Sequence, residues 1–337
     1  MIPGAPSEAR WFRTSPRRDL PADVLERIVS TAFPRNRVLA AESLGDGLRN
    51  SNFKLRLDSM REAIVLRIYE HDPSLCRKEL DLLGLVGSSV PVPEVLHAEP
   101  LALDGLPPFA LLRYVEGITF RELVRNGDGD AIAQAAYSTG ATLAAIGRFA
   151  FAKPGWLGPG PAATAPLLQG LDPVPRCVDL CLASPNLQPR MPPVLRGATH
   201  NLVWACAAQL RSLESESRLV HGDFGKRNIL VRAIAGRWSI AAVIDWEFAV
   251  SSSPLGDVAH FLRYERASRP QAEPHFTRGF SDAGGQLPED WRRLGKVLDL
   301  VALCEALTRD ELPEPAVVEL VELVRATVEN RELELAL

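Results

Sequence analysis

The sequence lacks the features that mark several classes of protein. No run approaches the roughly 18 consecutive apolar residues of a membrane-spanning helix, and the first residues contain no apolar core of signal-peptide length. The net charge of −4 creates no strong field toward nucleic acids or membranes. We therefore expect neither of these as a partner. The 337 residues suit one large or two modest domains, and the hydrophobic content of 46% is ordinary for a globular protein.

Cysteine is scarce in this sequence. The five cysteines are an odd number, and only Cys177 and Cys181 are close in sequence. Because no second close pair follows them, scattered thiols are a better interpretation than a metal site. This usage favours a reducing compartment, so we expect a cytoplasmic protein. Nothing in the sequence predicts the oligomeric state.

Two common phosphate-binding signatures are missing as well. No G-x-x-x-x-G-K-[ST] run occurs, which excludes a P-loop. The segment GDGLRNS, residues 45–51, lacks the third glycine of a dinucleotide fingerprint and precedes a predicted strand instead of a helix. Glycine still lets backbone amides approach phosphates closely, so Gly45 and Gly47 are candidate nucleotide-binding residues. An ordinary hairpin turn is the alternative.

The first third of the chain is predicted to be rich in strands. An amphipathic helix is expected over residues 21–32, and Asp72-Pro73 opens a second helix with Asp as N-cap and Pro in the first turn. Short apolar runs predict strands over residues 38–44, 52–57, 63–69 and 109–115.

Helices are predicted to dominate from residue 119 onward. Thr119–Glu122 reads TFRE, a capping box. Residues 153–195 are rich in Pro and Gly and are expected to form either an irregular insert or short helices joined by loops. Helical spacing or helix-start signals predict helices over residues 130–149 and 198–215, from Pro254, and over residues 289–309 and 313–335.

The most informative segments are HGDFGKRN at His221–Asn228 and VIDWEFA at Val243–Ala249. Residues 229–233 and 238–244 read as two strands, with Gly236 in the turn between them. Asn228 enters this hairpin and Asp245 leaves it, so the two should sit side by side on strands about 4.8 Å apart. Two such oxygen ligands suit Mg²⁺, which needs only one or two protein oxygens besides phosphates and water.

Asp223 lies on a loop five residues before Asn228. At that position its carboxylate is free to approach another atom, such as a hydroxyl that is to be deprotonated.

Residues 221–228 and 243–249 resemble the catalytic and metal-binding loops of the aminoglycoside phosphotransferase and choline kinase family. Protein kinases have H-R-D-L-x-x-x-N and D-F-G at these places. Here Gly222 replaces the Arg, and Asp245-Trp246-Glu247 replaces D-F-G, which favours the small-molecule kinases. The resemblance extends from about residue 40 to about residue 265.

This resemblance implies an α+β, protein-kinase-like fold with two lobes. The N-terminal nucleotide-binding lobe, residues 1–115, should be rich in strands with one helix. The mainly helical C-terminal lobe, residues 116–337, should bind the substrate. The catalytic loop would be residues 221–228 and the metal loop residues 243–249.

The resemblance also implies a role for each site residue. Asp223 would orient or accept the proton of a hydroxyl, while Asn228 and Asp245 would bind Mg²⁺. Arg67 stands where protein kinases have a Lys for the α- and β-phosphates, and Glu79 is its expected partner. An ordinary exposed Glu is the alternative for residue 79.

Further residues complete the expected site. The adenine is expected on backbone groups near Arg113, Tyr114 and Val115, and Asp257 should brace the backbone of the catalytic loop. The alternative for Asp257 is that its carboxylate merely stabilises the N-terminus of a helix through the helix dipole. His221 is expected to hold its loop by hydrogen bonds. Lys226 or Arg227 would either touch phosphate or be a solvated charge.

The predicted function is an ATP- and Mg²⁺-dependent O-phosphotransferase that acts on a small hydroxylated molecule, with GTP as the other possible donor. Aminoglycosides or other antibiotics are the first candidates; choline, homoserine, methylthioribose and sugar-like metabolites remain open. Glu247 and Glu265 are the nearest acidic candidates for binding a polycation, and solvated side chains are the alternative. A non-catalytic nucleotide-binding regulator is a second hypothesis. A protein kinase is disfavoured by the missing A-P-E segment and the short stretch between Asp245 and Pro254.

Overall fold

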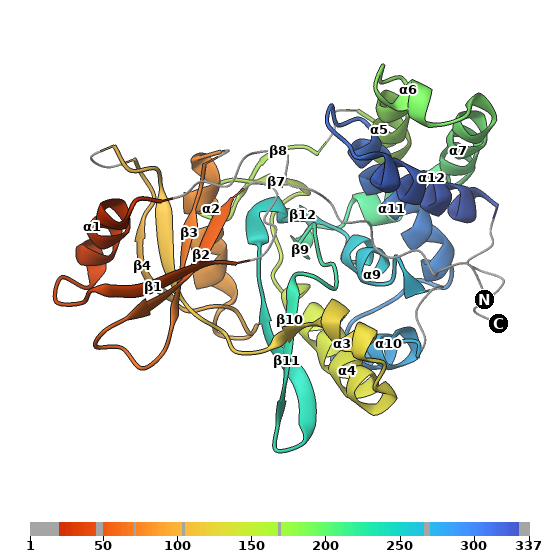
Figure 1. Cartoon of the computed structure of the whole chain (residues 1–337). Helices are drawn as coiled ribbons and strands as arrows, with labels where there is room; N and C mark the ends of the chain where they lie inside the picture. The colour runs from red at the N-terminus through yellow and green to blue at the C-terminus, as the bar shows by residue number, and fades with distance from the viewer. Residues whose placement is uncertain are drawn as a thin grey trace.

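A five-stranded antiparallel sheet forms the N-terminal part of the computed structural model, which describes residues 20–44, 50–70, 72–102, 105–167, 170–265 and 270–329. The strand order is β1-β2-β3-β5-β4 (Figure 1). The strands are β1 (Val38–Ser43), β2 (Ser51–Leu57), β3 (Ile64–Ile68), β4 (Val95–Glu99) and β5 (Phe109–Arg113). All but β4 were predicted.

Each face of this sheet is covered by one helix. Helix α1 (Ala22–Ala32) packs on the face that carries Leu55 and Leu111, and α2 (Ser74–Val86) packs on the opposite face (Figure 1). Side chains alternate between the two faces of a strand, so neighbouring residues of β5 serve different cores. Helix α2 begins one residue later than predicted, because Pro73 is the N-cap; Asp72 still accepts a hydrogen bond from the Ser74 amide at 3.0 Å.

The C-terminal part is mainly helical. Its helices are α3 (Phe120–Asn126), α4 (Gly129–Ile146), α5 (Pro173–Leu182), α6 (Leu187–Arg190), α7 (Pro193–Ala205), α8 (Ala207–Glu214), α9 (Leu255–Phe261), α10 (Glu273–Asp282), α11 (Trp291–Leu307) and α12 (Glu314–Val328). The capping box is present: the Thr119 side chain accepts from the Glu122 amide, and the Glu122 carboxylate accepts from the Thr119 amide.

Three helical segments differ from expectation. The single helix predicted over residues 198–215 is two helices, α7 and α8, which are separated at Cys206. The insert over residues 153–195 contains short helices, α5 and α6, as one of its two interpretations expected, but a short β-hairpin that was not predicted precedes them. Helix α10 was not predicted. Among the residues described, no helix is both long and apolar enough to cross a bilayer.

Two small sheets lie next to residues 221–228 and 243–249. One has the order β11-β10-β6 and the other β8-β7-β12-β9. Their strands are β6 (Ile118–Thr119), β7 (Gly155–Leu157), β8 (Ala163–Ala165), β9 (Arg218–Val220), β10 (Ile229–Ile234), β11 (Arg237–Val243) and β12 (Val250–Ser252). The predicted hairpin is β10–β11, in which Ile234 pairs with Arg237 across a two-residue turn. Both turn residues, Ala235 and Gly236, have positive φ, as in the turns that suit the twist of a hairpin.

Helices α4 and α10 cross in very close contact at two glycines. A Cβ atom on Gly140 of α4 would lie 1.9 Å from the Phe276 carbonyl oxygen. A Cβ atom on Gly279 of α10 would lie 2.0 Å from the Tyr137 carbonyl oxygen. Because both obstacles are backbone atoms, neither can move aside without separating the helices.

We expect Gly140→Ala to destabilise the protein by about 1–3 kcal/mol or more, since the added methyl group overpacks a backbone–backbone contact. Gly197→Ala is the matched control, because Gly197 lies inside α7 with nothing within 4 Å of an added Cβ. That change should stabilise the protein by about 0.5–1 kcal/mol through helix propensity. Urea-induced unfolding of both variants measures the difference; equal stabilities would contradict the crossing geometry.

Candidate active site

The β10–β11 hairpin brings Asn228 and Asp245 to one end of the sheet. The Ile244 amide donates to the Asn228 carbonyl at 3.0 Å, so Asp245 follows directly after the residue opposite Asn228. The Asn228 side-chain amide donates to the backbone oxygen of Asp223 at 2.9 Å and to Asp223 Oδ2 at 2.8 Å. With its nitrogen turned to Asp223, Asn228 offers its Oδ1 atom to a cation. Asp245, at φ 69°, has a carboxylate that is 30% exposed.

The Asp223 carboxylate is 36% exposed and is therefore open to an incoming group. The carboxyl group is nevertheless partly buried, and this loss of solvent is the first cause that raises the pKa of Asp223, to about 6; the nearby negative charge of Asp245 is the second. A carboxyl group with such a pKa is close to the range in which it can accept a proton near neutral pH.

His221 is fully buried and holds the loop by hydrogen bonds. Its Nδ1 atom accepts from the Asp223 amide at 3.2 Å, and its Nε2 atom lies 3.1 Å from the Ile244 carbonyl oxygen. Burial lowers the pKa of His221 to about 4, so the ring is neutral, with its proton on Nε2 facing the carbonyl. These contacts fit a structural role, because both ring nitrogens are engaged by the backbone.

Asp257 in α9 braces the same loop. Its carboxylate accepts from the His221 amide at 2.6 Å and from the Gly222 amide at 3.0 Å. Gly222 has φ 79°, and a Cβ atom there would lie 2.3 Å from the Phe248 carbonyl oxygen. The loop therefore needs glycine at the position where protein kinases have arginine.

Arg67 on β3 joins the sheet to the segment 243–249. It is 7% exposed; its Nε lies 2.9 Å from Glu79 Oε2, and its Nη2 lies 2.6 Å from Asp245 Oδ1. Glu79 also accepts from the Tyr69 hydroxyl at 2.7 Å and from the Trp246 amide at 3.2 Å. The structure thus places the expected partner beside Arg67 and excludes an exposed Glu79.

Glu247 is not a solvated side chain. It is 4% exposed, and its Oε2 accepts from the Asn50 side chain at 2.5 Å. Its backbone oxygen accepts from Lys78 Nζ at 2.7 Å. Glu247 therefore ties two segments of the N-terminal sheet region to the segment 243–249 instead of facing solvent.

Lys226 and Glu265 are also buried, at 5% and 8% exposure, and their charged groups lie 3.3 Å apart. The alternative of a solvated charge is therefore excluded at both positions. The reason is the internal ion pair, which lets two charges leave water together.

The segment after β5 contains the residues expected near the adenine. Tyr114 donates its amide to the Ala63 carbonyl at 3.2 Å, and Lys54 Nζ lies 3.8 Å from the centre of the Tyr114 ring. Tyr114 and Val115 are half-buried. Gly45 and Gly47 lie outside the described residues.

One residue near Asp223 was missed. His260 of α9 has its Nε2 atom 3.3 Å from Asp223 Oδ1. A signal was available, because His260 lies three residues after Asp257, and residues at that spacing share one face of a helix.

The side chains placed to bind a metal ion suit an ion that takes most of its ligands from molecules other than the protein. In the part of the chain that the structure describes, no group of three or more His, Cys, Asp or Glu side chains is placed to hold a metal. Asn228 and Asp245 supply two oxygen donors, which fits Mg²⁺ because that ion takes its other ligands from phosphates and water. All five cysteines have free thiols.

Comparisons with known proteins give the family of the chain and the class of its fold. A model of the "Phosphotransferase enzyme family" matches residues 40–296. The chain is 27% identical over 237 residues to acyl-CoA dehydrogenase family member 11 of Gallus gallus, a match that covers 67% of this chain and 28% of the relative's length.

Solved structures of similar fold are aminoglycoside phosphotransferases. One is a thermostable mutant of APH(4)-Ia with AMP-PNP and hygromycin B, with TM-score 0.64, 19% identity, and coverage of 90% of this chain and 97% of that one. Another is the GDP and kanamycin complex of APH(2")-IIia, with TM-score 0.66, 20% identity, and coverage of 91% and 98%. The predicted fold, strand-rich in its N-terminal part and helical in its C-terminal part, is confirmed.

Proposed function

Since the chain belongs to the phosphotransferase enzyme family, we propose that it transfers the γ-phosphate of ATP to a hydroxyl group of a small molecule. The observation that supports this most directly is the convergence of Asp223, Asn228 and Asp245 at one end of the β10–β11 hairpin. GTP is the alternative donor, because the similar solved structures carry either adenine or guanine nucleotides.

In this proposal each residue has a distinct task. The hydroxyl of the acceptor gives its proton to Asp223 as its oxygen bonds to the γ-phosphorus, and the bond from that phosphorus to the bridging oxygen breaks to release ADP. Asn228 and Asp245 would hold Mg²⁺, which neutralises phosphate charge when bound. Arg67, kept in place by Glu79, would contact the phosphates.

We propose two lobes for these tasks. Residues 1–115 would bind the nucleotide, with Tyr114 and Val115 next to the base and the segment containing Gly45 and Gly47 near the phosphates. Residues 116–337 would bind the acceptor and carry the catalytic loop. A cytoplasmic location remains our expectation from the cysteine usage.

The acceptor is proposed as a small hydroxylated molecule, with an aminoglycoside or another antibiotic as the first candidate. Hygromycin B and kanamycin, which accompany the similar solved structures, are the natural probes. Aminoglycosides are polycations, and the burial of Glu247 and Glu265 removes the two carboxylates expected to attract them. Metabolites that are not polycations therefore stay in the comparison, together with a hydroxylated acyl-CoA, because one relative is named for acyl-CoA.

A panel of acceptors tests the proposal. The full-length protein is incubated with [γ-³²P]ATP and Mg²⁺ plus kanamycin, hygromycin B, choline, homoserine, methylthioribose or a hydroxylated acyl-CoA, and labelled product is separated. We expect transfer to at least one acceptor and none after removal of Mg²⁺ with EDTA. Tight binding of MgATP without transfer to any acceptor would favour a non-catalytic nucleotide-binding protein, and labelling of a peptide panel would favour a protein kinase.

A further inference from the structure

Helix α9 presents two polar side chains to the catalytic loop from successive turns. Asp257 accepts hydrogen bonds from the backbone amides of His221 and Gly222. His260, three residues later, has its Nε2 atom 3.3 Å from Oδ1 of Asp223. One face of one helix therefore contacts both the backbone of the loop and its reactive carboxylate.

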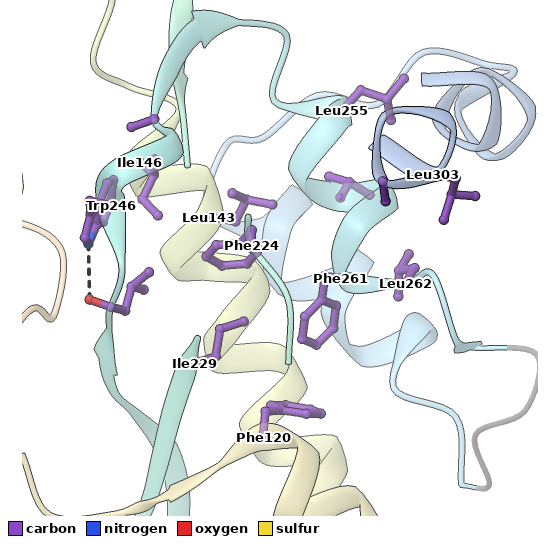
Figure 2. Close-up of a cluster of buried hydrophobic side chains, with 14 of the residues drawn as sticks. Phe120, Leu143, Ile146, Phe224, Ile229, Trp246, Leu255, Phe261, Leu262 and Leu303 are labelled. Carbon is purple, nitrogen blue, oxygen red and sulfur yellow. Dashed lines mark hydrogen bonds between the residues drawn. The ribbon is translucent and has the colours of Figure 1, made fainter. Parts of the chain in front are cut away.

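Buried aromatic neighbours fix the position of this pair. Phe224 follows Asp223 and Phe261 follows His260, and their ring centroids are 6.3 Å apart. Figure 2 shows Phe224 on the loop and Phe261 on α9 in the same buried cluster. Phe261 also stacks on Phe276 at 4.4 Å and meets the edge of Phe120 at 5.0 Å. Because these rings are closely packed, the adjacent Asp223 and His260 have little freedom to separate.

The loop also leaves space for the imidazole. A Cβ atom added to Gly225 would lie 3.3 Å from His260 Nε2 and 3.6 Å from its Cδ2. The distance of 3.3 Å is shorter than an ordinary van der Waals contact. The glycine at position 225 therefore lets the ring come close to the loop without being pushed away from Asp223.

The surroundings of His260 favour a neutral ring. Burial is the first cause that lowers the pKa of His260, to about 3, and the positive charge of Arg263 is the second; Asp299 opposes them. Arg263 and Asp299 are themselves a buried pair with contacts of 2.8 and 2.6 Å. A neutral imidazole has one N–H group. Facing a carboxylate oxygen, the Nε2 atom is favourably placed only if it carries that hydrogen.

We propose that His260 is a positioning residue that holds Oδ1 of Asp223 through its Nε2–H group, while Asn228 holds Oδ2. The carboxylate is then fixed in plane, and a remaining lone pair faces the acceptor hydroxyl. His260 takes up no proton in this scheme; the proton that leaves the hydroxyl stays on Asp223. The catalytic consequence rests on the proposed phosphotransfer, whereas the contact itself does not.

The contact is tested without any turnover. Nitrogen-15 NMR of imidazole-labelled protein resolves the tautomers of the six histidines, and the His260 signals are those lost in His260→Gln. We expect a neutral ring protonated at Nε2, whose Nε2 signal moves in Asp223→Ala. A ring protonated at Nδ1 or at both nitrogens, or an Nε2 signal that does not respond to Asp223→Ala, would overturn the proposal.

The catalytic consequence is tested with three variants on the best acceptor of the panel. His260→Leu removes the N–H donor. His260→Gln keeps a donor about as far from the backbone as Nε2, whereas the side chain of His260→Asn is too short to bring its donor to Asp223. Because hydrogen bonds to charged groups are the stronger kind, we expect kcat to fall about 10- to 100-fold in the Leu and Asn variants. The Gln variant should recover most of that loss, and the KM for ATP should change little in all three.

The outcomes separate the two proposals. Equal loss in the Gln and Leu variants, or a folded Leu variant with unchanged kcat, would overturn the positioning role. If the Leu variant does not fold, the comparison of Gln with Asn decides the same point. If no acceptor is phosphorylated, the proposed function fails, and the NMR result alone decides whether His260 holds Asp223.

Discussion

Replacement of Asp223 by Asn should lower kcat for phosphate transfer by about 10²- to 10⁴-fold, which is the usual contribution of a positioned general base. The amide has the same shape as the carboxylate, and its oxygen can still accept from Asn228, which donates to Asp223 Oδ2 at 2.8 Å in the native protein. The loop geometry should also persist because the hydrogen bonds that Asp257 accepts from the backbone of the loop do not involve the side chain of residue 223.

Binding of MgATP should survive in Asp223→Asn, since the metal is assigned to Asn228 and Asp245. Steady-state kinetics with the best acceptor measure kcat, and fluorescence titration with a labelled ATP analogue measures nucleotide affinity. Asp130→Asn, an exposed site in the first turn of α4, is the control for the loss of one negative charge. A kcat near that of the native protein would remove Asp223 from proton transfer, and a large loss of nucleotide affinity would assign it to the metal instead.

The hairpin of the candidate site could be predicted because its signals are local. The strand runs on both sides of Gly236 determine the pairing, and the pairing determines where Asn228 and Asp245 lie. The sheet of the N-terminal part was predictable for the same reason, since short apolar runs identify most of its strands. The relation between Asp257 and the loop came from the family resemblance, and the contacts of its carboxylate agree with it.

Contacts between distant segments were not predictable from one sequence. The Asn50 and Glu247 side chains meet across 197 residues. Both interpretations of Glu247 from the sequence, a contact to a polycation or a solvated side chain, placed it at the surface, because charged residues are usually exposed. His260 meets Asp223 only because the rings of Phe224 and Phe261 pack together. Helix α10 was not predicted, although Pro274 stands in its first turn and Phe276 and Phe280 recur at helical spacing. Its close packing on α4 at Gly279 is a contact between distant segments.

The second large effect is expected when Arg67 is replaced by Met. The change should destabilise the fold by about 3–5 kcal/mol, which is the usual cost of removing one partner of a buried ion pair. Its guanidinium contacts Glu79 at 2.9 Å, Asp245 at 2.6 Å and Glu247 at 3.5 Å. These surrounding carboxylates raise the pKa of Arg67 well above its ordinary value despite its burial. Met fills a similar volume, so the change removes charge and hydrogen bonds more than packing.

Urea-induced unfolding measures this effect against a matched substitution in the neighbouring helix. Arg77→Met removes an exposed arginine that pairs with Asp81 at 2.9 Å, and it should cost about 0.3–0.5 kcal/mol, as helix surface pairs do. Arg67→Lys keeps the charge but loses the planar fork, so it should lie between these two variants.

A double variant identifies the origin of the loss at Arg67. If the destabilisation comes from a carboxylate left without its partner, Arg67→Met combined with Glu79→Gln should be more stable than Arg67→Met alone, because the neutral amide does not need a cation. Lys78 lies nearby, and burial lowers its pKa to about 8, so it is a poor replacement for a permanently charged arginine. An Arg67→Met variant as stable as the native protein would mean that Lys78 does compensate the three carboxylates. Arg67 would then serve the phosphates alone, and its replacement should weaken MgATP binding without changing the unfolding midpoint.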